Sequence, residues 1–121
     1  MVRRTNYLVL VMLMLQATFF AATTLGFDNA QLQKFNSTNK CEKCDLSKAN
    51  FSNLDMYGVD LVGANLTGAN LSGASFNDAD LRDANLRGAN IEGTNFSGAK
   101  LSNTIWTDGK KCQSGSIGRC K

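Results

Sequence analysis

The sequence predicts an all-β solenoid in which short strands alternate with corners. Three observations support this prediction: from Cys44 to Asp108 an apolar residue recurs every five residues, a small residue usually precedes it by two places, and a turn-favouring residue usually follows it by two places. A helix with ~3.6 residues per turn would scatter such centres around its surface. A regular strand would point every second centre outward. The backbone must therefore turn once in each pentad.

The thirteen pentads keep one register. Their apolar centres are Leu46, Phe51, Met56, Leu61, Leu66, Leu71, Phe76, Leu81, Leu86, Ile91, Phe96, Leu101 and Trp106. Ala lies two places before the centre in eight pentads, and Asn or Asp lies between the two in ten. The alternation of a short strand puts the small residue and the centre inside and the Asn or Asp outside. The Gly, Asn and Asp residues that follow are those that tolerate a positive φ at a corner.

Four runs carry a family resemblance. They are Ala64-Asn-Leu-Thr-Gly, Ala69-Asn-Leu-Ser-Gly, Ala79-Asp-Leu-Arg-Asp and Ala84-Asn-Leu-Arg-Gly. These runs resemble the pentapeptide-repeat family, and small exported members from bacteria such as cyanobacteria in particular. The resemblance implies a right-handed quadrilateral β-helix of about three coils with capped ends, in which residues twenty apart stack.

Four regions follow along the chain. Residues 1–26 are predicted to be a signal peptide, because Arg3 and Arg4 precede an apolar run that ends in small residues. Residues 27–43 are an N-terminal cap segment with a candidate short helix that begins near Asp28. Residues 44–108 form the β-helix and residues 109–121 a C-terminal cap tied by a disulfide. An uncleaved membrane anchor is the alternative for the leader.

The four cysteines lie at the two ends of the repeat region. In an exported chain, disulfides are the first interpretation, and the whole stack between the pairs favours the local connectivity of Cys41 with Cys44 and Cys112 with Cys120. The Cys-x-x-Cys spacing of Cys41 and Cys44 also permits a redox centre. A zinc site of four cysteines is excluded, because the two pairs cannot converge.

The composition favours binding over catalysis. The chain has no His, which removes the commonest general base and metal ligand, and we expect no catalytic residue, metal or cofactor. The repeat region carries eight acids and four bases, so it offers no basic face to nucleic acid.

Two outward-facing sets depart from the repeat. The charged set comprises Asp60, Asp78, Asp80, Arg82 and Asp83, and the apolar set comprises Tyr57 and Val62. Either set is a candidate partner contact. The alternatives are a solvated face with local ion pairs or a weak Ca²⁺ contact for the first set. For the second, the alternative is burial under the upstream segment.

The sequence thus predicts an exported, non-catalytic structural or protein-binding scaffold, located in the periplasm or thylakoid lumen or secreted. Its partner is an unknown protein, with no nucleic acid and no membrane after cleavage, and the chain is a monomer or a weak end-to-end dimer. Some members of the family it resembles look like DNA duplexes to topoisomerases, which gives one alternative. A thiol-redox protein that uses Cys41 and Cys44 is the other.

Overall fold

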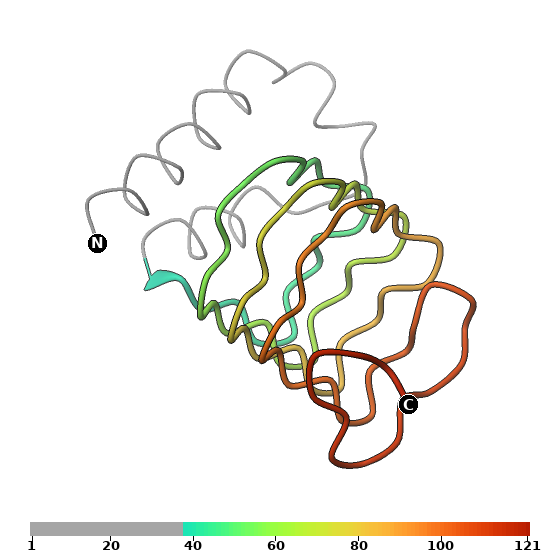
Figure 1. The fold of residues 1–121 in the computed structure, drawn as a ribbon. Coiled ribbons are helices and arrows are strands. Elements are labelled where there is room, and N and C mark those ends of the chain that lie inside the picture. The colour runs from blue at the N-terminus through green and yellow to red at the C-terminus, as the bar shows by residue number, and fades with distance from the viewer. Residues whose placement is uncertain (1–37) are drawn as a thin grey trace.

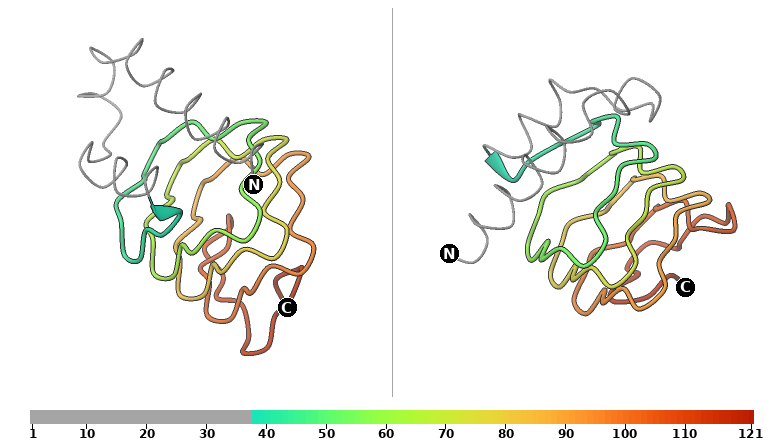
Figure 2. Two further views of the ribbon diagram at one scale, coloured as in Figure 1. Left: turned by 90° about the vertical axis from the view of Figure 1, so that its left-hand side faces the viewer. Right: turned by 90° about the horizontal axis from the view of Figure 1, so that it is seen from above.

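The computed structural model describes residues 38–121. The predicted signal peptide and the candidate helix near Asp28 lie outside the described residues. From Thr38 onward the chain winds into stacked coils, and the C-terminal residues fold at the last of them (Figures 1 and 2).

Each coil has four sides, because parallel pairing joins residues that are twenty apart. The strands are reduced to isolated paired residues at every fifth position from Lys40 to Ile105. We name the sides by these residues. Side A holds Lys40, Asp60, Asp80 and Lys100; side B holds Asp45, Asn65, Asn85 and Ile105; side C holds Asn50, Asn70 and Asn90; side D holds Asp55, Ser75 and Asn95. Four pentads therefore make one coil, as the resemblance implies.

The interior is filled by the predicted centres and small residues. Leu46, Leu66 and Leu86 stack on side B and are fully buried. On side D the rings of Phe76 and Phe96 stack with their centroids 5.8 Å apart. Most places two before a centre hold Ala because a larger side chain would compete with the centres for the interior.

The outward Asn and Asp residues shape the backbone. At all ten predicted positions a side-chain oxygen accepts a hydrogen bond from the N–H two residues later, as in the 3.0 Å bond from Ser52 to Asn50. This Asx turn bends the chain out of the strand and toward the corner. The preference for Asn and Asp is therefore conformational, and the sequence pattern alone had placed them only on the outside.

The corners have the predicted positive φ, with two differences. Lys48 takes a φ of 60° although its side chain is not of the turn-favouring type. In the last pentad the positive φ falls at Gly109, with a value of 85°, and not at Asp108 as predicted. The Asp108 side chain instead accepts a 3.0 Å hydrogen bond from the N–H of Lys110. The coil is abandoned there, and Ile105 pairs antiparallel with Lys111.

The stack extends beyond its predicted start. Lys40 already pairs with Asp60, and Cys41 is fully buried as an interior centre, so pairing reaches into the segment predicted as the N-terminal cap. Cysteine at a centre escapes a pattern search that looks for large apolar residues. The four cysteines form disulfides between Cys41 and Cys44 and between Cys112 and Cys120, with Cα atoms 5.2 and 4.9 Å apart.

Candidate protein-binding surface

Side A brings the two central carboxylates of the charged set together. Asp60 and Asp80 are paired through their backbones in neighbouring coils, and Lys40 and Lys100 are paired with them at either end. Along the stack, side A is therefore a column that begins with the cation Lys40, continues with two carboxylates and ends with the cation Lys100. The rigid coil fixes this order, because each residue is separated from the next by one full coil.

Asp80 is the most constrained member of the column. Its Oδ1 accepts a 2.8 Å hydrogen bond from Nε of Arg82, and its Oδ2 accepts a 2.7 Å bond from Nη2 of the same guanidinium. Nζ of Lys100 lies 3.9 Å from Oδ2. The bidentate geometry holds the arginine fork along the coil. Half of the Arg82 side chain remains exposed, so the guanidinium still faces solvent.

The same contacts shift the pKa values of this pair. The hydrogen bond from the Arg82 side chain lowers the pKa of Asp80 below its ordinary value, although partial burial opposes the shift. Asp80 in turn raises the pKa of Arg82. Both groups are therefore charged at neutral pH, and side A presents a fixed ion pair.

Asp78 and Asp83 lie at the two corners that bound the Asp80 pentad. Their φ angles are 56° and 59°, and both side chains are exposed. Gly98 stacks next to Asp78, and a Cβ at this glycine would overlap the Asp78 carboxylate. The charged set thus occupies one side and its two edges, which is consistent with the outward positions predicted for it.

Tyr57 and Val62 belong to neighbouring sides of one coil. Tyr57 is exposed, with 52% of the residue accessible to solvent. Val62 is only partly exposed, and its N–H donates to Oδ1 of Asp60 at 3.2 Å. Val62 therefore lies next to the charged set on side A, whereas Tyr57 lies on side D. Leu54 and Val59, which occupy the place two before a centre where most pentads have Ala, are buried in the core.

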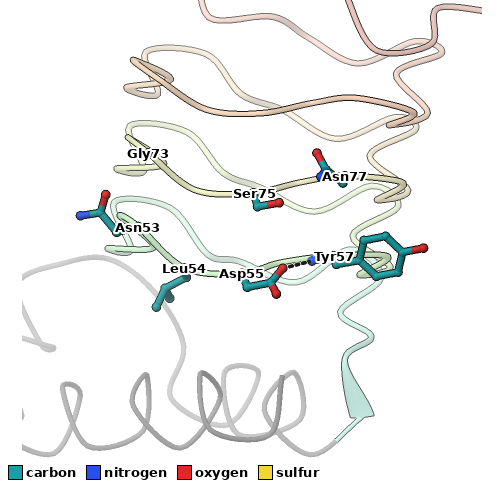
Figure 3. Close-up of a pocket in the computed structure, with 7 residues that line it drawn as sticks. All are labelled: Asn53, Leu54, Asp55, Tyr57, Gly73, Ser75 and Asn77. Atoms are coloured by element: carbon teal, nitrogen blue, oxygen red, sulfur yellow. Dashed lines mark hydrogen bonds between the residues drawn. The ribbon is translucent and has the colours of Figure 1, made fainter. Parts of the chain in front are cut away.

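Side D has a shallow hollow that sequence reasoning missed. It has a volume of about 340 Å³ and lies between two coils (Figure 3). Its lining residues are Asn53, Leu54, Asp55, Tyr57, Gly73, Ser75 and Asn77. Ser75 explains the hollow, because it is smaller than the Asn or Asp found at ten of the thirteen equivalent places. The signal in the sequence was Ser75 itself, which is the smallest of the three residues, with Lys100 and Ile105, that break the Asn/Asp pattern.

A metal-binding group, a reduced Cys-x-x-Cys pair and a membrane-spanning helix are all lacking among the described residues. Within residues 38–121, His, Cys, Asp and Glu do not gather in groups of three that could hold a metal. Both cysteines of the Cys-x-x-Cys pair are oxidised and at most 3% exposed. Sulfur atoms so placed stabilise the first coil and are poorly accessible to a disulfide substrate. Over the same residues there is no helix with the length and apolar character that a bilayer span requires.

Comparison with known proteins agrees with this geometry. The family model described as Pentapeptide repeats (8 copies) matches residues 40–68 and 64–103 of the chain. Among curated proteins none matches the chain.

Solved structures of cyanobacterial proteins are similar to it. The pentapeptide repeat protein Rfr23 from Cyanothece 51142 is 41% identical, with a TM-score of 0.53, over 54% of this chain and 45% of that one. HetL, a pentapeptide repeat protein involved in heterocyst differentiation regulation from Nostoc sp. strain PCC 7120, is 40% identical, with a TM-score of 0.42, over 55% of this chain and 30% of that one. The chain therefore covers less than half the length of either protein.

Proposed function

Because the chain belongs to the pentapeptide repeat family, whose fold is a right-handed quadrilateral β-helix, we propose that it is a non-catalytic scaffold that binds a protein partner through side A and its corners. The observation that carries this proposal is the fixed arrangement of Asp60 beside Asp80, whose pentad is bounded by the exposed residues Asp78 and Asp83. Arg82 neutralises Asp80 and leaves the other three acids to attract a partner.

The rigidity of this surface supports recognition. Backbone hydrogen bonds join each coil to the next, as in the 2.8 Å bonds from Leu61 N–H to the Asp80 carbonyl and from Asp80 N–H to the Val59 carbonyl. Carboxylates on such a scaffold lose little conformational entropy when a partner binds. The interior is packed with Leu, Phe and Ala side chains, so ligands are left with the outer surface. A basic protein surface is the complementary partner.

The proposal includes the form and location of the protein. About three coils are closed at the C-terminal end by the tail after Asp108, and the mature chain is a monomer or a weak end-to-end dimer. Cleavage of residues 1–26 releases it into the periplasm or thylakoid lumen, without a membrane anchor. Two disulfides in a chain of 121 residues support an oxidising compartment. The similarity to a cyanobacterial protein supports a cyanobacterial source. The mass of the native protein tests the cleavage, and a full-length membrane-bound species would contradict it.

Partner capture tests the binding surface. Covalent crosslinking in the native exported fraction should retain a partner with the natural chain and lose most of it when Asp60, Asp78 and Asp83 are changed to Asn. A matched control changes Asp45, Asp55 and Glu92, three acids outside the charged set, to their amides. Both variants should keep their stability within about 1 kcal/mol, because the changed groups are at the surface.

Three outcomes would overturn the proposal. Equal loss of capture by both triple variants would assign the effect to net charge rather than to side A. Inhibition of a purified topoisomerase would favour the DNA-mimic alternative, although the cations Lys40 and Lys100 limit the acidic column to two carboxylates. Reduction of a disulfide substrate that Cys41→Ser stops would replace the scaffold with a redox protein.

A further inference from the structure

The C-terminal tail covers two of the four sides of the last coil. On side A, Leu101 N–H donates to the Ser116 carbonyl at 2.9 Å, and Gly118 N–H to the Ala99 carbonyl at 2.9 Å. On side B, Trp106 N–H donates to the Lys110 carbonyl at 2.7 Å. Gly88 is the last residue before side C whose N–H is paired with the following coil, and it donates to the Thr107 carbonyl at 3.0 Å. Side C begins at the next residue.

Side C ends in backbone groups that lack a partner among the described residues. One coil earlier, Leu71 and Gly73 donate their N–H groups to the carbonyls of Asn90 and Glu92, both at 2.8 Å. The corresponding N–H groups of Ile91 and Gly93 have no such acceptor within residues 38–121, nor has the Ala89 carbonyl a donor there. An edge of this kind can pair with another extended chain.

Apolar side chains lie at the same end of the stack. Ile91 and Trp106 are only partly buried, in contrast to the centres above them. The Trp106 ring reaches across the end of the core to Phe96, with ring centroids 5.3 Å apart. A strand added at side C would cover Ile91 and extend this apolar contact.

Positive charge surrounds the end. A hollow of about 320 Å³ is lined by Trp106, Asp108, Lys110, Lys111, Arg119, Cys120 and Lys121. Gly109 lies against the Arg87 guanidinium, at the corner between sides B and C. Two copies that met end to end at this surface would bring like charges together, which disfavours a second copy as the occupant. The charge instead matches an acidic segment.

We infer that side C at the C-terminal end accepts a short, extended, acidic segment of a partner protein as an added strand. The segment receives hydrogen bonds from the N–H groups of Ile91 and Gly93 and donates one to the Ala89 carbonyl. Its acidic side chains lie toward Lys110, Lys111, Arg119 and Lys121. Such β-augmentation takes affinity from the backbone and specificity from the side chains. The chain turns at Gly93, with a φ of 69°, so a straight segment pairs with one side only. This surface is separate from side A, and its test does not depend on the proposed function.

Amide hydrogen exchange of the full chain gives the first test. In the free protein the amides of Ile91 and Gly93 should exchange at least tenfold faster than those of Leu71 and Gly73. A capped Glu-Val-Glu-Val-Glu peptide should slow the exchange of the first two and leave the second two unchanged. The same peptide with N-methyl groups on the backbone edge that pairs should give no protection, because it cannot form the ladder.

Charge variants give the second test. Changing Lys110, Lys111, Arg119 and Lys121 to Gln should weaken peptide binding at least tenfold. The same change at Lys40, Lys43 and Lys48 removes positive charge from the opposite end of the stack and should have much less effect. A Lys-Val-Lys-Val-Lys peptide should not bind.

Each contrary result overturns the inference in a different way. Slow exchange of Ile91 and Gly93 in the free protein would mean that the chain itself already covers the edge. Protection that grows with protein concentration would identify a second copy as the occupant. Binding that survives N-methylation, or that is equal for the basic peptide, would exclude recognition by an acidic added strand.

Discussion

The hydroxyl of Thr104 donates a 2.7 Å hydrogen bond to the carbonyl oxygen of Leu81, and both residues are fully buried. The two lie in neighbouring coils, 23 residues apart. Thr94 makes the same contact with Leu71 at 2.8 Å. Threonine thus replaces the usual Ala of the repeat without leaving a buried hydroxyl unsatisfied, because the coil above supplies an acceptor.

Thr104→Val tests this bond, since it keeps the shape of the side chain and removes the donor. The Leu81 carbonyl still accepts a 3.1 Å bond from Ala84 N–H. We therefore expect the free energy of unfolding to fall by only about 1 kcal/mol, measured by urea denaturation. Thr107→Val makes the same change on the outside of the stack and should be close to neutral. Equal stability of the two variants would show that the buried bond contributes nothing net.

Gly98→Ala should destabilise the chain more than Gly58→Ala does. Both glycines have positive φ, 71° and 61°, so both substitutions carry the conformational penalty of about 1–2 kcal/mol. Only at Gly98 does the added Cβ also overlap the Asp78 carboxylate, whereas at Gly58 it meets open space. Thermal unfolding of the pair separates the two effects. A larger loss at Gly58 would contradict this steric explanation.

Leu71→Asp should abolish cooperative unfolding. Leu71 is fully buried among the centres of side C, and an unpaired carboxylate in that dry interior costs several kcal/mol, a large part of a small domain's stability. Circular dichroism during urea denaturation would show the loss of the transition. The control is Ser72→Asp, one residue later on the outer surface. A Leu71→Asp protein with unchanged stability would refute the register of the core.

The stabilising charge on Asp80 should depend on pH in a defined direction. Arg82 lowers the pKa of Asp80 in the folded chain, so this stabilisation is fully present above the ordinary aspartate pKa and is lost as the pH falls through the lowered value. Arg82→Gln should raise the Asp80 pKa, as followed by NMR titration of the carboxyl carbon. Arg87→Gln, in the equivalent place of the next pentad, should leave that pKa unchanged.

The cost of removing each disulfide should not follow loop length alone. In the chain-entropy model the nine-residue loop of Cys112 and Cys120 is worth about 2.6 kcal/mol and the four-residue loop of Cys41 and Cys44 about 2 kcal/mol. Cys41 and Cys44 are both buried in the core, whereas in the other pair Cys112 is buried and Cys120 only partly so. We therefore expect changing both Cys41 and Cys44 to Ser to cost at least as much as the same change at Cys112 and Cys120, despite the shorter loop. Denaturant midpoints of the two double variants decide this.

Sequence pattern was sufficient for the repeat itself, because each pentad meets the same local demands. A centre such as Leu66, a small residue such as Ala64 and a corner such as Gly68 each have a role that depends on nearby backbone geometry. The column of Asp60 and Asp80 followed from the same regular spacing once four pentads were assigned to a coil. These features could be predicted because stacking repeats them every twenty residues.

What the sequence by itself determined was therefore the periodic part: the period, the inward and outward places and the positions of the charged set. Only the tertiary structure decided where the period begins and ends and which groups pair outside it. Cys41 is a centre because the coil beside it buries it, and Gly109 reverses the chain because Ile105 finds Lys111 as an antiparallel partner. The physical reason is that the ends lack a neighbouring coil on one side, so contacts distant in sequence replace the local rule there.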